Sequence, residues 1–165
     1  MNTAEKENTS MNFLRKMDKL CHSLSVSQGR MFEKSILEGI PSYSFIKSFM
    51  CSNEAYELDL LNLESAGITE VEIYQSVKSK IKTRRGEILS FPLMHFIGYF
   101  YRSASYMLGI KSRTLFQEIP VKFLVENYLT LHSLSIEEAI KEAVEANKCV
   151  SKSNEEKFLE NYKQI

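Results

Sequence analysis

The stretch from Ile88 to Ile110 reads ILSFPLMHFIGYFYRSASYMLGI, and Arg102 is its only residue with a formal charge. Pro92 suits the first turn of a helix, and the apolar residues after it recur at helical spacing. A helix that is apolar nearly all round is either buried in a protein or spans a membrane. Its length would allow a span of about 20 residues, but His95, Arg102 and several tyrosines make insertion costly. We therefore predict a central helix that is buried on several sides.

One polar line runs along this predicted helix. Its members are spaced four, three and four residues apart, so they share a face: His95, Tyr99, Arg102 and Tyr106. A polar line on an otherwise apolar helix indicates an internal pocket with a polar end, and such chambers form between helices in all-α folds. The candidate ligand-binding residues are His95, Tyr99, Arg102, Phe45, Phe49 and Phe96. The alternatives are complete packing of the aromatic residues and an Arg102 that reaches the surface to pair with a glutamate.

Helical periodicity also dominates the rest of the chain. We expect a helix from about Asn8 to a serine-rich break at 23–27, and a second helix that ends at Gly39. Two capping boxes are predicted further along, Thr69 with Glu72 and Ser135 with Glu138. A long C-terminal helical pattern covers 121–132 and continues over 136–144. These patterns predict an all-α single domain of roughly seven to nine helices over residues 11–165, preceded by a flexible tail over residues 1–10.

Composition narrows the classes of function. Lys plus Arg and Asp plus Glu both number 21, which gives no general case for nucleic acid or an anionic membrane as partner. The three cysteines lie far apart with no metal-ligand spacing, so we expect reduced thiols and a cytoplasmic protein. We expect no signal peptide and no membrane span. No metal site is predicted.

No catalytic motif is present, so we predict a protein that is not an enzyme. The chain lacks a glycine-rich phosphate loop, a nucleophile elbow and an HExxH sequence. A small enzyme acting on a lipid stays a third possibility, without a nucleophile or base that we could name. The three histidines lie far apart and are more often packed residues than haem ligands. The basic run at 78–85 favours a runner-up function, a helical DNA-binding transcriptional regulator that uses the 69–85 segment.

Three stretches carry a resemblance to a known family: PSYSFIKSFMCSNEAYELDLLNLESAGIT (41–69), FPLMHFIGYFYRSASYMLGI (91–110) and EIPVKFLVENYLTLHSLSIEEAIKEAV (118–144). The chain resembles the haem-free globin-type sensor domain proteins of bacilli, which are sporulation-inhibitory proteins similar to the sensor domain of a sporulation histidine kinase. The resemblance covers about residues 11–150 and rests on overall likeness rather than on a short motif.

This resemblance implies a globin-like fold without haem, with a fatty acid in the space that haem would occupy. It also implies a halide ion near that ligand, a homodimer formed through the last long helices, and inhibition of sporulation kinase signalling. A buried carboxylate needs a cation or a donor, so Arg102 is its natural partner, with His95 or Tyr99 as a second donor. We therefore expect a cytoplasmic, non-enzymatic sensor that binds a fatty acid or a similar apolar molecule and no nucleic acid.

Overall fold

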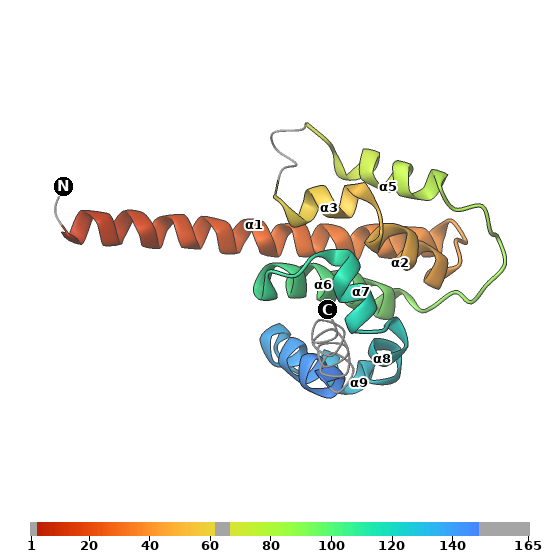
Figure 1. The fold of residues 1–165 in the computed structure, drawn as a ribbon. Helices are drawn as coiled ribbons and strands as arrows, with labels where there is room; N and C mark the ends of the chain where they lie inside the picture. Colours follow the sequence, from red (N-terminus) through yellow and green to blue (C-terminus); the bar gives the residue numbers. More distant parts are fainter. Residues whose placement is uncertain (1–2, 62–66, 149–165) are drawn as a thin grey trace, which may run out of the picture.

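The computed structural model describes residues 3–61 and 67–148, with side chains from Asp18 onward. Over these residues the chain is helical without strands, which confirms the predicted all-α fold (Figure 1). A last helical stretch covers residues 136–148. The other helices are α1 (Thr3–Leu37), α2 (Ser42–Met50), α3 (Asn53–Asp59), α5 (Glu70–Ser79), α6 (Phe91–Leu108), α7 (Ser112–Glu118), α8 (Val121–Glu126) and α9 (Tyr128–His132).

The first helix is longer than the sequence predicts. It begins at Thr3, inside the segment predicted to be a flexible tail, and its first half projects beyond the other helices (Figure 1). The predicted break at 23–27 is wrong, because α1 continues through it. Ser25 satisfies its hydroxyl within the helix by donating a hydrogen bond to the Cys21 carbonyl at 2.8 Å, and Ser25 itself is buried.

Helix α6 crosses α1 closely and is buried on several sides, as predicted. Its buried residues include Met94, Phe96 and Arg102, which lie on different sides of the helix. At the crossing, a Cβ on Gly98 would lie 2.8 Å from the Gln28 carbonyl oxygen, so only a glycine permits this approach. The predicted apolar stripe of α6 does not stay buried to its end, because Met107 and Leu108 are exposed.

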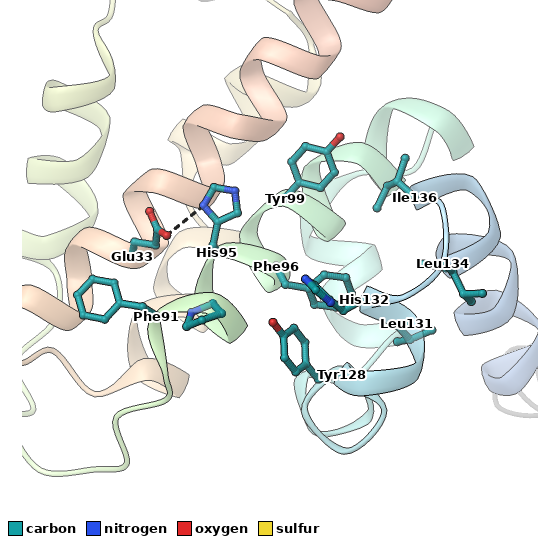
Figure 2. Close-up of a pocket in the computed structure, with 12 residues that line it drawn as sticks. Glu33, Phe91, His95, Phe96, Tyr99, Tyr128, Leu131, His132, Leu134 and Ile136 are labelled. Carbon is teal, nitrogen blue, oxygen red and sulfur yellow. Dashed lines mark ion pairs between the residues drawn. The ribbon is translucent and has the colours of Figure 1, made fainter.

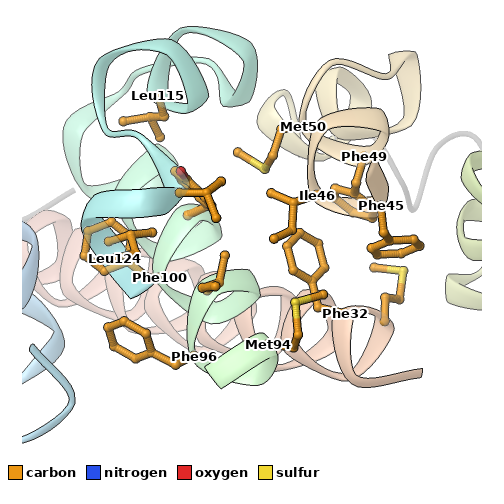
Figure 3. Packing of buried hydrophobic residues seen from close by; sticks show 14 of the residues in the cluster. Phe32, Phe45, Ile46, Phe49, Met50, Met94, Phe96, Phe100, Leu115 and Leu124 are labelled. Carbon is orange, nitrogen blue, oxygen red and sulfur yellow. The ribbon is translucent and has the colours of Figure 1, made fainter. Parts of the chain in front are cut away.

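An aromatic cluster forms the core between α1, α2 and α5 (Figure 3). The Phe32 ring contacts the rings of Phe45 and Phe49 edge-on, with centroid distances of 5.4 and 5.1 Å. The Tyr74 ring lies 5.7 Å from that of Phe45. All four side chains are almost completely buried, so this part of the fold is filled by packed rings and not by a chamber.

The C-terminal half differs from the predicted pattern in two places. The predicted helix over 121–132 is divided into α8 and α9 at Asn127, whose φ of −106° and ψ of 12° depart from helical values. Helix α7 was not predicted, although Leu115 and Ile119 recur at helical spacing and are both buried. Both predicted capping boxes are present, at Thr69 and at Ser135.

The basic 69–85 segment does not form a helix-turn-helix. It contains one helix, α5, and residues 81–90 that follow are not helical. Two of its basic side chains already have acidic partners, because Lys78 pairs with Glu38 and Lys80 lies 2.9 Å from Glu54. The structure therefore adds no support to a DNA-binding role for this segment. Within the described part of the chain, no helix combines the length and hydropathy needed to cross a membrane.

Candidate ligand-binding pocket

A cavity of about 690 Å³ lies between α6 and the helices at the C-terminal end of the described chain (Figure 2). Helix α1 contributes one residue to its wall, and the rest come from α6, α9 and the segment after it. The lining residues are Glu33, Phe91, Pro92, His95, Phe96, Tyr99, Tyr128, Leu131, His132, Leu134, Ile136 and Ala139.

The helical spacing of α6 builds one wall of the pocket. His95 and Tyr99 are four residues apart and therefore project from the same face, with their rings stacked at a centroid distance of 6.4 Å. Phe96 meets the opposite wall, where its ring lies 5.4 Å from that of Tyr128 and 6.3 Å from that of His132. These edge contacts join α6 to α9 along the pocket wall.

The pocket opens to the surface rather than being sealed inside the fold. Phe91 and Leu134, which both line it, are 41% and 37% exposed. Leu131 and Ala139, deeper in the wall, are each about 1% exposed. A ligand could therefore enter past Phe91 and Leu134 and place apolar atoms against the buried wall. This differs from the enclosed internal pocket that the sequence suggests.

The polar end of the pocket is organised by α1. The His95 Nδ1 lies 3.3 Å from the Glu33 carboxylate, and both side chains are 34% exposed. The His95 ring rests directly on Gly29, where a Cβ would come within 2.9 Å of the ring. The Tyr99 hydroxyl lies 3.1 Å from Nδ1 of His22. Three residues of α1 thus hold the two polar rings of α6 in place. Gly29 and Glu33 contact His95, and His22 contacts Tyr99.

Arg102 does not reach this pocket, which corrects its predicted place beside His95 and Tyr99. Its guanidinium is fully buried and reaches away from the pocket to α3, with Nη1 2.6 Å from the Asp59 carboxylate. Gln28 accepts a hydrogen bond from Nε at 2.8 Å, and Ser112 accepts one from Nη2 at 3.1 Å. The reason is that a buried guanidinium must be paired, and Asp59 of α3 supplies that charge. The alternative of a surface glutamate partner is also wrong.

The other predicted ligand-binding residues divide between the pocket and the core. His95, Tyr99 and Phe96 line the pocket, whereas Phe45 and Phe49 belong to the packed aromatic core and do not. Sequence reasoning missed Glu33 and the residues of α9, Tyr128 and His132. The missing information is the pairing of α6 with α9, because no local spacing relates these segments. The only available signal was that Tyr128 and His132 share one helix face.

A second cavity of about 440 Å³ adjoins the pocket and shares Tyr99 and Ile136 with it. His22 lines this second cavity, while His95 and His132 line the first. The Tyr99 ring therefore contacts two histidines that are far apart in sequence, His22 at a centroid distance of 5.9 Å and His95 at 6.4 Å, whereas His132 contacts Phe96 and Tyr128. Among the described residues, no group of three or more histidines, cysteines and acidic residues is placed to hold a metal ion.

The described lining of the pocket combines an apolar wall with a few polar groups. Its wall is mainly aromatic and aliphatic, with two imidazoles, two phenols and one carboxylate at the edges. The described lining residues include no serine, cysteine or lysine. A comparison with known proteins finds no matching family model, curated protein or solved structure. The globin-like arrangement and the resemblance to sporulation-inhibitory sensor proteins therefore stay predictions.

Proposed function

We propose that this chain is a non-enzymatic sensor that binds a fatty acid or a similar apolar molecule in the pocket between α6 and α9. Ligand binding would change how the protein acts on a signalling partner. The resemblance stated above suggests that this partner is a sporulation histidine kinase pathway and that the effect is inhibition. The same resemblance suggests a homodimer in the cytoplasm, no haem, and a halide ion near the ligand.

The observation that carries the proposal is the pocket itself. A volume of about 690 Å³ falls within the usual range of small-molecule sites, roughly 300–1,000 Å³. Buried aliphatic residues such as Leu131 and Ala139 form its deep wall, and polar groups lie at its edge. Each methylene that leaves water on binding contributes about 0.8 kcal/mol before ordering costs. An alkyl chain is therefore the ligand part that this wall favours.

The position of the pocket suits a sensor because it joins two parts of the fold. Its walls come from the central helix α6 and from the C-terminal helices, which contact each other there through Phe96, Tyr128 and His132. A ligand that fills this junction would fix the distance between the two parts. It would then shift the population of conformations only to the extent that it binds one of them better.

A reporter tryptophan tests the proposal, because the chain has none of its own. Phe91→Trp places the indole at the pocket mouth, and Leu37→Trp is the matched control, since Leu37 is exposed and does not line the pocket. Adding the uncharged probe dodecanol should shift the emission of Phe91→Trp saturably and leave Leu37→Trp unchanged. No saturable shift in Phe91→Trp, or an equal shift in both variants, would refute an apolar ligand site here.

Two further measurements test the other parts of the proposal. Organic extraction of the purified protein, followed by mass spectrometry, should release a bound lipid, while the visible spectrum should lack a haem Soret band. Expression in a sporulating bacillus should lower the spore yield. An Ala139→Leu variant, which narrows the pocket from its deep wall, should alter that effect if ligand binding controls signalling. An unchanged spore yield would contradict the sporulation role and leave the ligand site untouched.

A further inference from the structure

The pocket between α6 and α9 has an acidic group at its polar end and no fixed positive charge. Among the described residues that line it, the carboxylate is Glu33, and neither lysine nor arginine is present. The imidazoles of His95 and His132 can donate or accept hydrogen bonds, and His95 Nδ1 lies 3.3 Å from the Glu33 carboxylate. A negatively charged head group would therefore meet the Glu33 carboxylate without a lysine or arginine in the described lining.

Two basic side chains on the helices that line the pocket are engaged elsewhere. Arg102 of α6 is buried against Asp59. Lys34, which follows Glu33 on α1, has its ammonium 4.5 Å from the centre of the Tyr74 ring, on the side of α1 that faces α5. Neither group can turn toward the pocket without losing its present partner. Arg30, three residues before Glu33 on α1, is exposed and is not among the lining residues. The described wall itself therefore offers neither lysine nor arginine to a bound carboxylate.

The adjoining cavity has the same charge pattern. Its described lining residues include the carboxylates of Asp18 and Glu137 together with His22, again without lysine or arginine. Because this cavity shares Tyr99 and Ile136 with the pocket, its acidic groups lie beside the pocket. Charges at the edge of a low-dielectric cleft raise the local concentration of ligands of opposite sign.

From this pattern we infer that the ligand of the pocket is a single-chain amphiphile with a positively charged amine head group. This inference rests on the apolar site of the proposed function, and it replaces the fatty acid named there with an amine that has a similar alkyl chain. The alkyl chain lies against Phe96, Leu131 and Ala139, and the ammonium group donates to the Glu33 carboxylate at the pocket's polar end. Hydrogen bonds to charged partners of this kind are about twice as strong as neutral ones. Among the described lining residues, a fatty-acid carboxylate has no lysine or arginine as a partner.

Three probes with the same twelve-carbon chain separate the head group from the chain: dodecylammonium, dodecanol and dodecanoate. We would measure their binding by isothermal titration calorimetry at about pH 8, below their micelle concentrations, so that the amine and the acid are both charged. The wild type should bind dodecylammonium about tenfold more tightly than dodecanol, and dodecanoate more weakly than either. Raising the salt concentration should lower the affinity for dodecylammonium, because salt screens its charge. The affinity for the uncharged dodecanol should not fall in the same way.

A charge-removing variant assigns the effect to one residue. Glu33→Gln should abolish most of the tenfold preference for the amine over dodecanol and leave dodecanol binding unchanged. Glu142→Gln is the matched control, because it changes the net charge equally at an exposed position outside the pocket lining. Glu33 is partly exposed, so its variant should fold, and the thermal midpoint checks this.

The outcomes separate this inference from the proposed function. Dodecanoate binding as tightly as dodecylammonium would overturn the amine head group while the apolar site stands. The same conclusion would follow if Glu33→Gln kept the wild-type preference, or if Glu142→Gln lost it equally. If dodecanol and both charged probes fail to bind, the apolar site itself is wrong, and the inference fails with it.

Discussion

Replacing Arg102 with methionine should destabilise the protein strongly without changing the pocket. The Arg102 side chain is fully buried, and Asp59 is 3% exposed, so neither charge has water as a substitute partner. Removing one partner of a buried ion pair typically costs about 3–5 kcal/mol, because the other charge is left uncompensated. Methionine fills a similar volume, so the loss measures mainly the charge and its hydrogen bonds.

The expected loss can be followed by urea unfolding with circular dichroism. With an unfolding slope of about 2 kcal/mol/M, a loss of about 3–5 kcal/mol lowers the urea midpoint by roughly 1.5–2.5 M. Asp59 also accepts hydrogen bonds from Ser112, at 2.9 Å from its amide and 2.6 Å from its hydroxyl. The loss should therefore loosen the start of α7 as well as the contact between α3 and α6.

The double variant Arg102→Met with Asp59→Asn is the control. Asparagine keeps an oxygen for the Ser112 amide but carries no charge, so the double variant should be at least about 1 kcal/mol more stable than Arg102→Met alone. A single variant that loses less than about 1 kcal/mol would refute the reasoning, as would a double variant no more stable than the single one. A folded Arg102→Met protein should bind the twelve-carbon probes with the same affinity as the wild type. If Arg102 held a ligand carboxylate, the affinity for dodecanoate would instead fall clearly.

Further predictions concern the helix crossing, acid stability and the oligomeric state. Gly98→Ala should lower the free energy of unfolding in urea by about 1–3 kcal/mol, because the new Cβ meets backbone atoms of α1. Gly29→Ala should leave that free energy nearly unchanged, but it should displace the His95 ring and weaken probe binding. Glu54 is partly desolvated, but hydrogen bonds from Ser76 and Lys80 outweigh this and lower its pKa from 4.5 to about 2. Its ionised form therefore contributes stability above about pH 4.5, up to about 3 kcal/mol, which is lost as the pH falls toward 2. Glu54→Gln should flatten the pH dependence of the thermal midpoint in that window, and an unchanged pH profile would contradict the assignment. Sedimentation at tens of micromolar should show a homodimer, and Leu129→Glu should dissociate it, because Leu129 is 83% exposed within the predicted interface. A wild-type monomer under those conditions would contradict the predicted dimer.

Local sequence signals were sufficient for the helical fold and for several of its details. The near absence of charge from Ile88 to Ile110 indicated the buried helix, and α6 has buried residues on several of its sides. The capping boxes at Thr69 and Ser135 also formed as predicted, because a cap depends on residues only three positions apart. Where local signals were weak, the prediction failed: the serines near 25 suggested a break, but packing against α6 keeps α1 continuous.

Only the tertiary structure decided which residues form the pocket. Helical spacing placed His95, Tyr99 and Arg102 on one line, yet a long arginine side chain can reach in several directions, and the position of Asp59 determined which one it takes. The opposite wall carries Tyr128 and His132, which are distant from the α6 residues in sequence. The chain turns after α7 and again after α8, and these turns bring α9 back to α6. Sequence alone therefore determined which helices form and which of their faces are apolar. The charge and shape of the site came from contacts between those helices, because a residue's spacing specifies its face but not its partner.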